Sequence, residues 1–359
     1  MTTGQFRFTF RSNEGDEALV EPHFVRPFDA ETLLESDDGQ CLGLDLEMQS
    51  RGMTLNEERH EELFDVRARV QFPEALTVFS LVRGGWLPMP FTIPPRFLVD
   101  RNVVIQLRRI REGGNVPNSQ ALLWWTRLFE EGSAMFNPLP YAFEGAYRRK
   151  PTKAEFVQAF DEGSAEIEQA LPACHVIRYN EQNYDAAYDQ LEAFDRRAAR
   201  EIAFLVAVAP MIAQRPSEAQ LWTTAREVLN LADRHQIQKG SMPTLAALSC
   251  VFEDQQGSVR SIGRALLKPS ATYTEADAFN GLSDIRHIEM TSAGQTHFGA
   301  ESFAFCTCDR GVARFWSALA LRGVPGEGDV IENTFDLGTD MFSRLDQAGI
   351  LRLRDELSR

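Results

Sequence analysis

The sequence predicts an α/β protein with a parallel central sheet, a large helical insertion and a small β-rich N-terminal domain. Three observations support this fold class. Residues 1–90 hold alternating strand patterns, two later apolar runs each end in an aspartate, and helical periodicity dominates residues 152–265. The 359 residues allow about two domains of ordinary size, and a hydrophobic share of 43% is normal for a globular chain.

The N-terminal domain is expected to be rich in β-strands. Residues 5–11 alternate strictly, with phenylalanines on one face, and residues 64–72 alternate in the same way. This two-residue period is typical of strands that are buried on one side. A proline-rich segment follows at 87–95, and because proline cannot donate a backbone hydrogen bond, it marks the end of the domain near residue 90.

The predicted core is divided between residues 91–151 and residues 266–359, on either side of the insertion. In the first half, the short apolar run at 97–99 suits a buried parallel strand, and a helical pattern follows it. In the second half, residues 303–308 form another apolar strand candidate. A helix from about 340 to 357 is expected to close the chain.

The helical insertion opens at a capping box, Thr152-Lys153-Ala154-Glu155. In this motif the threonine hydroxyl accepts from a free backbone N–H of the first turn, and the glutamate reaches back to the capping residue. Ser217-Glu218-Ala219-Gln220 repeats the pattern and predicts the start of another helix.

The charge is distributed unevenly along the chain. The formal net charge is −15, from 37 Lys and Arg against 52 Asp and Glu, which argues against a nucleic-acid partner for the chain as a whole. Residues 1–90 hold 17 acids and 8 arginines, whereas residues 96–153 hold 10 basic residues and 5 acids. The segment at 96–153 is therefore compatible with contact to phosphate groups.

The cysteine content and the apolar runs indicate a cytoplasmic protein. Five cysteines, an odd number in a long chain, do not suggest a disulfide framework. The first seven residues contain no apolar signal core. The longest apolar run, at 202–213, is interrupted by Pro210 and is shorter than the ~20 residues that a bilayer requires. No membrane partner is expected.

Two acids stand where a parallel sheet usually binds its ligands. Asp100 and Asp309 directly follow the two apolar runs, and ligands of parallel α/β sheets bind at the carboxyl ends of the strands. A later helix adds Asp277, Asn280 and Asp284 on one face. Each of these acids also has a plainer interpretation, as a helix N-cap or as part of a solvated helix face.

Four short motifs around these acids resemble those of PIN-domain nucleases. Residues 98–104, LVDRNVV, are similar to the strand–Asp–x–Asn opening of the family, and residues 305–315, FCTCDRGVARF, to its Thr–x–Asp strand-to-helix motif. Residues 280–285, NGLSDI, are similar to the helix that carries the third acid. Residues 137–145, NPLPYAFEG, hold the best candidate for the glutamate of the family.

The resemblance covers residues 96–150 and 270–325 and implies a three-layer PIN-like fold interrupted by the helical insertion. It also implies a metal-dependent endonuclease that uses Mg²⁺ or Mn²⁺ to cut RNA or, less often, DNA. The catalytic and metal-binding acids that it implies are Asp100, Glu144, Asp284 and Asp309.

The roles of these acids follow from the preference of hard cations for oxygen ligands. Mg²⁺ takes only one or two carboxylates, together with waters and phosphate oxygens. We expect Asp100 and Asp309 as direct ligands, while Asp284 and Glu144 complete a second site or hold metal-bound waters. Two acids of the preceding helical pattern, Glu130 and Glu131, are alternatives to Glu144.

Polar neighbours of the acids complete the expected site. Asn102 and Thr307 are expected to orient the carboxylates. Arg101 stands where the family usually has threonine or serine. This arginine either pairs with Asp100 and weakens cation binding, or holds a phosphate of the substrate.

The densest basic patch follows Glu144 closely. It consists of Arg148, Arg149, Lys150 and Lys153. These cations are expected to bind the phosphate backbone of a substrate next to the metals. The alternative is that they are solvated residues at the start of the following helix.

The leading hypothesis is an endoribonuclease that acts as a toxin or an anti-phage effector. The rival hypothesis is a catalytically degenerate PIN-like scaffold that binds a partner, which Arg101 and the acidic total favour. A third hypothesis gives the acidic residues 1–90 an antitoxin-like or nucleic-acid-mimic role. A protein partner or a second copy of the chain is expected to bind through the N-terminal or helical region.

Overall fold

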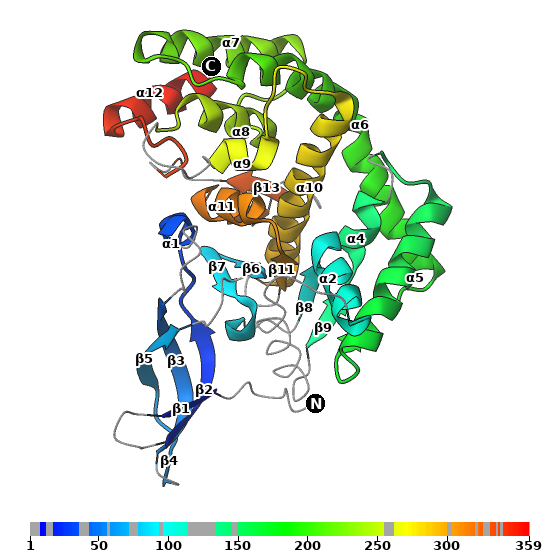
Figure 1. The fold of residues 1–359 in the computed structure, drawn as a ribbon, viewed down its shortest axis with the longest axis vertical. Helices are drawn as coiled ribbons and strands as arrows, with labels where there is room; N and C mark the ends of the chain where they lie inside the picture. Colours follow the sequence, from blue (N-terminus) through cyan, green and yellow to red (C-terminus); the bar gives the residue numbers. More distant parts are fainter. Residues whose placement is uncertain are drawn as a thin grey trace.

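The computed structural model shows a mixed α/β protein with two larger sheets (Figure 1). The structure describes residues 8–11, 17–35, 43–55, 58–71, 78–92, 96–113, 134–145, 149–254, 262–299, 303–319, 322–325, 331–334, 337 and 340–358. The expected α/β class is confirmed at this level, with parallel strands present in one of the sheets.

The N-terminal sheet is antiparallel and contains five strands in the order β1–β2–β3–β4, with β5 also paired to β3. Its elements, together with the short helix that follows β2, are β1 (Phe8–Arg11), β2 (Glu17–Val25), α1 (Ala30–Glu35), β3 (Gly43–Leu55), β4 (Glu58–His60) and β5 (Phe64–Gln71). The predicted alternation in β5 is confirmed, because Val66, Ala68 and Val70 pack against the core while Arg67 and Arg69 are exposed.

The central sheet has six strands in the order β10–β9–β8–β11–β6–β7. Its strands are β6 (Phe79–Val82), β7 (Gly85–Pro88), β8 (Arg96–Val99), β9 (Met135–Asn137), β10 (His175–Val176) and β11 (Phe303–Thr307). The two strands predicted from short apolar runs, β8 and β11, are direct parallel neighbours, with Leu98 opposite Phe305.

The expected parallel central sheet is confirmed only in part. The β6–β7 hairpin is antiparallel and pairs with β11, so the sheet is mixed. This hairpin occupies residues 79–88, which the sequence pattern assigned to the N-terminal domain. Its burial explains the difference, because every residue of both strands is buried in the central core.

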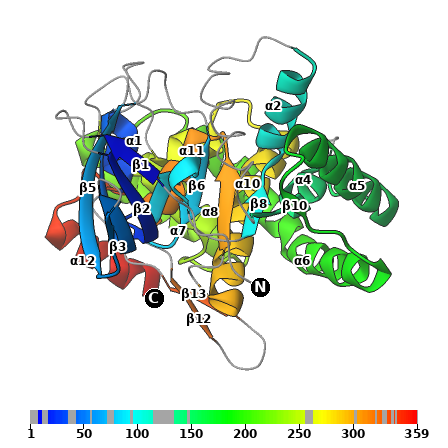
Figure 2. The same cartoon turned by 90° about the horizontal axis from the view of Figure 1, so that it is seen from below.

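In Figure 1 the helices lie mostly above and to the right of the central sheet, and several of them belong to the stretch of chain between its two halves (Figures 1 and 2). The α-helices outside the N-terminal sheet are α2 (Arg101–Arg111), α4 (Leu139–Glu144), α5 (Lys153–Ala170), α6 (Glu181–Ile212), α7 (Leu221–Arg234), α8 (Met242–Val251), α9 (Ile262–Leu267), α10 (Glu275–Phe298), α11 (Arg310–Leu319) and α12 (Gln347–Ser358). Two 3₁₀ turns, Met89–Phe91 and Glu218–Gln220, and a hairpin of β12 (Arg322–Pro325) and β13 (Ile331–Thr334) complete the described elements.

The helical insertion begins as the sequence predicts. The Thr152 hydroxyl accepts from the backbone N–H of Glu155, and the Glu155 carboxylate accepts from that of Thr152, which is a complete capping box. The insertion does not stand apart from the core, because α6 packs along α10 and shares one continuous hydrophobic cluster with the central sheet. None of the helices in the described ranges is both long and apolar enough to cross a membrane.

Candidate functional site

The two strand-end acids lie side by side at the carboxyl edge of the parallel strands. Asp100 follows β8 and caps α2, where one of its carboxylate oxygens accepts from the backbone N–H of Arg101 at 2.7 Å. Asp309 follows β11, and its Oδ1 accepts from the backbone N–H groups of Gly311 at 2.6 Å and Val312 at 3.2 Å. Both acids therefore have the helix-capping role that their sequence position suggested, and each keeps its second oxygen for other partners.

Thr307 links these two acids. Its hydroxyl donates to Oδ2 of Asp100 at 2.7 Å and accepts from the backbone N–H of Asp309 at 3.0 Å. The side chain is fully buried at the end of β11. Thr307 therefore fixes the carboxylate of Asp100 as the sequence analysis predicted for this position.

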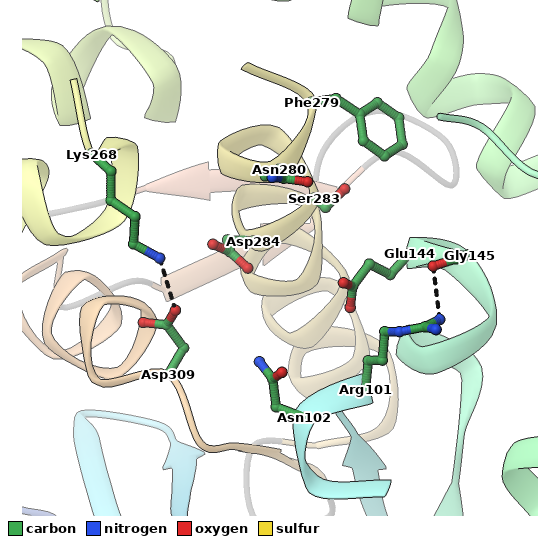
Figure 3. A pocket seen from close by; sticks show the side chains of 10 residues that line it. All are labelled: Arg101, Asn102, Glu144, Gly145, Lys268, Phe279, Asn280, Ser283, Asp284 and Asp309. Carbon is green, nitrogen blue, oxygen red and sulfur yellow. Dashed lines mark hydrogen bonds and ion pairs between the residues drawn. The ribbon is translucent and has the colours of Figure 1, made fainter. Parts of the chain in front are cut away.

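Two further acids reach the same place from helices. Asp284 comes from the middle of α10 and Glu144 from the last position of α4. Both line one pocket of about 310 Å³, together with Asn102 and Asp309. Figure 3 shows the side chains of Asp284, Glu144 and Asn102 pointing into this common space. The structure thus gathers the four predicted acids, with Asp100 buried next to the pocket that the other three line.

Burial, and then mutual repulsion, raises the pKa values of three of these acids. Burial raises the pKa of Asp100 to about 6, with the charge of Asp309 adding to the shift and the Thr307 hydrogen bond opposing it. Burial and then the charge of Asp100 raise the pKa of Glu144 to about 7. The pKa of Asp284 lies well above its ordinary value, because of burial and then the charges of Asp309 and Asp100. A cation in the pocket would relieve this repulsion.

Arg101 links the start of α2 to the end of α4. Its guanidinium donates to the carbonyl of Gly145 at 2.7 Å and lies over the ring of Tyr141, 5.0 Å from the ring centroid. This geometry fits neither of the two roles expected for Arg101. The guanidinium is not paired with Asp100, and it is not free to bind a phosphate. Arg101 instead holds the segment that carries Glu144, and its charge lowers the pKa of that carboxyl.

Asn102 occupies the position expected of an orienting residue. Its amide nitrogen lies 3.5 Å from Oδ2 of Asp100, the same oxygen that accepts from Thr307. This contact is long for a hydrogen bond, so Thr307 is the stronger of the two restraints.

The basic patch after Glu144 is bound to neighbouring acids. Arg149 forms a two-pronged ion pair with Glu155 at 2.7 and 3.0 Å. Lys150 contacts Glu192 at 2.5 Å and Asp195 at 3.3 Å. Arg148 lies outside the residues that the structure describes, as do the alternative acids Glu130 and Glu131. The described cations of the patch tie the loop to α5 and α6, and they do not line the pocket.

Lys268 is the site residue that the sequence analysis missed. It follows α9, and its ammonium nitrogen lies 3.5 Å from Oδ2 of Asp309, on the side of the pocket opposite Glu144 (Figure 3). The one signal in the sequence is its rarity, since the chain has 33 arginines and 4 lysines. Ser283 and Asn280 also line the pocket from α10, whereas Asp277 caps the start of that helix.

The donor set suits a hard divalent cation. Within the described ranges, no three His, Cys, Asp or Glu side chains are grouped closely enough to hold a metal ion as they stand. Mg²⁺ requires only one or two carboxylates, because waters and phosphate oxygens supply the other ligands. The pocket offers carboxylate and amide oxygens, and burial followed by mutual repulsion raises the pKa values of Glu144 and Asp284 there.

Comparison of the chain with protein-family models, with curated proteins and with solved structures finds no match.

Proposed function

We propose that the chain is a PIN-like endonuclease that hydrolyses phosphodiester bonds with the help of Mg²⁺ or Mn²⁺. One observation carries the proposal. Acids from the ends of two parallel strands and from two helices gather around a single polar pocket, and their pKa values are raised by burial and mutual repulsion. Such shifts at a cleft are typical of functional sites.

Asp309 and Asp284 are the residues best placed to hold the cation. Both line the pocket, and after burial the charge of Asp309 is the next largest cause of the raised pKa of Asp284. Asp100 is buried beneath them, and Thr307 and Asn102 fix its carboxylate. A bound divalent ion supplies a Lewis acid that polarises the phosphate and activates water.

Glu144 is the residue best suited to accept a proton from the attacking water. Its carboxyl lines the pocket, and its pKa of about 7 lets it exchange protons near neutral pH. Arg101 positions this residue by holding Gly145 and Tyr141. The chain therefore provides a proton acceptor on one side of the pocket and cation ligands on the other.

RNA is the proposed substrate, on the strength of the resemblance to PIN-domain nucleases at residues 98–104 and 305–315. The resemblance also underlies the proposed biological role as a toxin or an anti-phage effector. The described cations Arg149 and Lys150 contribute to phosphate binding only after they leave their ion pairs with α5 and α6.

Cleavage of a labelled single-stranded RNA with Mn²⁺ tests the proposal. Asp100→Asn and Asp309→Asn are each expected to lower the rate by about 100-fold or more, because Asp309 loses a carboxylate that would hold the cation and Asp100 loses the buried charge beside it. Asp233→Asn, which changes an exposed acid paired with Lys239, serves as the control and should cleave like the parent. Parental rates in both site variants would overturn the assignment.

A second candidate function is a non-catalytic PIN-like protein that binds a partner. The ion pair between Lys268 and Asp309 favours it, because an ammonium group already balances one of the carboxylates. Calorimetric titration with Mn²⁺ separates the two functions. A folded protein that binds no Mn²⁺ at about 10 mM would be the non-catalytic one, since catalytic sites for hard cations bind well below that concentration.

A further inference from the structure

Lys268 has a backbone conformation that is unusual for its residue type. It lies at the end of α9, where its N–H donates to the carbonyl of Arg264 at 3.0 Å and its φ is +50°. This is the left-handed region, which favours glycine at the ends of helices. A lysine kept in such a conformation is a reason to ask what its side chain does.

The Lys268 side chain is only weakly held. Asp309 is its one ion-pair or hydrogen-bond partner within the described ranges, and the 3.5 Å separation is longer than that of a strong charge-assisted hydrogen bond. The side chain is 57% exposed. The other pocket cation, Arg101, is fixed by Gly145 and Tyr141. Of the two pocket cations, Lys268 is therefore the one whose contact with a carboxylate another cation can replace.

The ion pair is not needed to hold α9 against α11. These helices already meet at Gly311, where an added Cβ would lie 2.8 Å from the carbonyl oxygen of Ala265. Backbone-to-backbone packing this close fixes the helices without help from an exposed side chain. The position of Lys268 is thus set by the packing, and its charge is available for another role.

We propose that Lys268 is a built-in counter-cation that competes with the divalent ion for the carboxylate of Asp309 and thereby sets the metal affinity of the pocket. The inference rests on the proposed function, because it assumes that this pocket binds a divalent ion. Lysine suits the role better than arginine, since its compact ammonium is a point charge without the two-pronged grip of a guanidinium on a carboxylate. Removal of the ammonium leaves Asp284 and Asp309 uncompensated and favours the metal ion.

Titration of the full chain with Mn²⁺, followed by calorimetry and by the electron paramagnetic resonance of free Mn²⁺, tests the proposal. Lys268→Met is expected to bind Mn²⁺ at least about fivefold more tightly than the parent, as loss of a nearby positive charge requires. Lys268→Arg retains the charge and is expected to bind within about twofold of the parent or more weakly, because a guanidinium pairs more firmly with a carboxylate.

Arg310→Met is the matched control for a general change in the electrostatic potential around the pocket. Arg310 is adjacent to Asp309 in the chain, but its guanidinium lies over the ring of Phe79, 5.6 Å from the centroid. Its loss should change Mn²⁺ affinity by less than about twofold, because its guanidinium is engaged with the ring of Phe79. A gain equal to that of Lys268→Met would show that net charge, and not the ion pair, sets the affinity, and would overturn the inference.

The outcomes separate this inference from the proposed function. Equal affinities of the parent and Lys268→Met would overturn the counter-cation role and leave the proposed metal site standing. Binding by Lys268→Met alone would support the role, because the ammonium then keeps the ion out of the parent. An absence of binding in every variant at about 10 mM Mn²⁺ would overturn the proposed function, and the inference with it.

Discussion

The hydroxyl of Thr307 lies 2.7 Å from a carboxylate oxygen of Asp100, and this bond joins the ends of two adjacent parallel strands. The same hydroxyl accepts from the backbone N–H of Asp309, so one buried oxygen restrains both strand-end acids. The sequence separation of 207 residues between Thr307 and Asp100 makes this bond a consequence of the sheet. Loss of this hydrogen bond should therefore affect both the stability of the fold and the chemistry of the site.

Thr307→Val removes this hydroxyl while keeping the shape of the side chain. The variant leaves a carboxylate oxygen of the buried Asp100 without its shortest hydrogen bond and the N–H of the half-buried Asp309 without its acceptor, which is expected to lower the free energy of unfolding by about 1–3 kcal/mol. The pKa of Asp100 should rise further, because the Thr307 bond lowers it. Urea unfolding measures the first effect, and Thr307→Ser, which keeps the hydroxyl, is the control. A Thr307→Val protein as stable as the parent would contradict the bridging role.

Local sequence signals predicted the elements that carry the acids. Short apolar runs ending in Asp100 and Asp309 predicted β8 and β11, since a continuous apolar run suits a strand buried on both faces. The capping box at Thr152 predicted the start of α5, since both of its hydrogen bonds lie within four residues. These signals depend on neighbours in the chain and are therefore readable from sequence.

The features that the sequence did not reveal depend on contacts between distant segments. The β6–β7 hairpin joins β11 through a pairing of Leu81 with Phe305, which no local pattern encodes. Arg101 was considered only as a partner of Asp100 or of phosphate, and its bond to Gly145 became visible only once α2 and α4 were placed together. Lys268 likewise reaches Asp309 across 41 residues of chain.

Asp284→Asn is expected to stabilise the protein at about pH 8 in the absence of metal. Burial and the charges of Asp309 and Asp100 raise the pKa of Asp284 far above its ordinary value, so ionisation of this carboxyl costs folding free energy at that pH. Removal of the charge should recover about 1–3 kcal/mol. Thermal unfolding in EDTA measures the gain, and the same variant should lose most of the Mn²⁺-induced rise in melting temperature. A lower melting temperature in EDTA would contradict the repulsion.

The free energy of unfolding of the parent is expected to fall as the pH rises from about 6.5 to about 8 in EDTA. The pKa values of about 7 for Glu144 and Glu289, together with the raised pKa of Asp284, mean that the folded state holds more protons than the unfolded state in this range. Below it, His287 opposes the trend, because its pKa is lowered to about 4 and the unfolded imidazole binds the additional proton.

Urea unfolding at a series of pH values checks this slope. Glu144→Gln should make the slope shallower, since it removes one of the protonated groups, and saturating Mn²⁺ should do the same by replacing protons with metal. The exposed Asp233→Asn is the control and should leave the slope unchanged. A stability that rises over this range would contradict the raised pKa values of the pocket acids.

Arg101→Ala is expected to slow RNA cleavage by about tenfold without unfolding the protein, as the loss of a positioning contact typically does. The variant frees Gly145 and Tyr141, so Glu144 loses its fixed place. It also removes a charge that lowers the pKa of Glu144, so the acid limb of the pH–rate profile should move to higher pH. Arg108→Ala, on the same helix and paired with Glu162, is the control. An unmoved acid limb would show that Arg101 does not act through Glu144.

Alanine substitutions at Gly263 and Gly281 test two different helix contacts. The contact at Gly263 helps to place Lys268, whereas the contact at Gly281 has room for a methyl group. A Cβ at Gly263 would lie 2.2 Å from the carbonyl oxygen of Ala246 and 2.8 Å from Cβ of Ser249, so Gly263→Ala must push α9 away from α8. At Gly281 the nearest atom is 3.4 Å away, at the end of Leu267, and alanine also favours the helix.

We therefore expect Gly263→Ala to lower the free energy of unfolding by about 1–3 kcal/mol, as overpacking does. Gly281→Ala should change it by less than about 1 kcal/mol, or raise it, since the helix gains propensity where the space is ordinary. Because α9 carries Lys268 at its end, the displacement at Gly263 should also alter Mn²⁺ affinity, whereas Gly281→Ala should leave it within about twofold of the parent. Equal free energies of unfolding of the two variants in urea would show that α9 can move away from α8 without loss of stability. The contact between α8 and α9 would then not fix the position of Lys268.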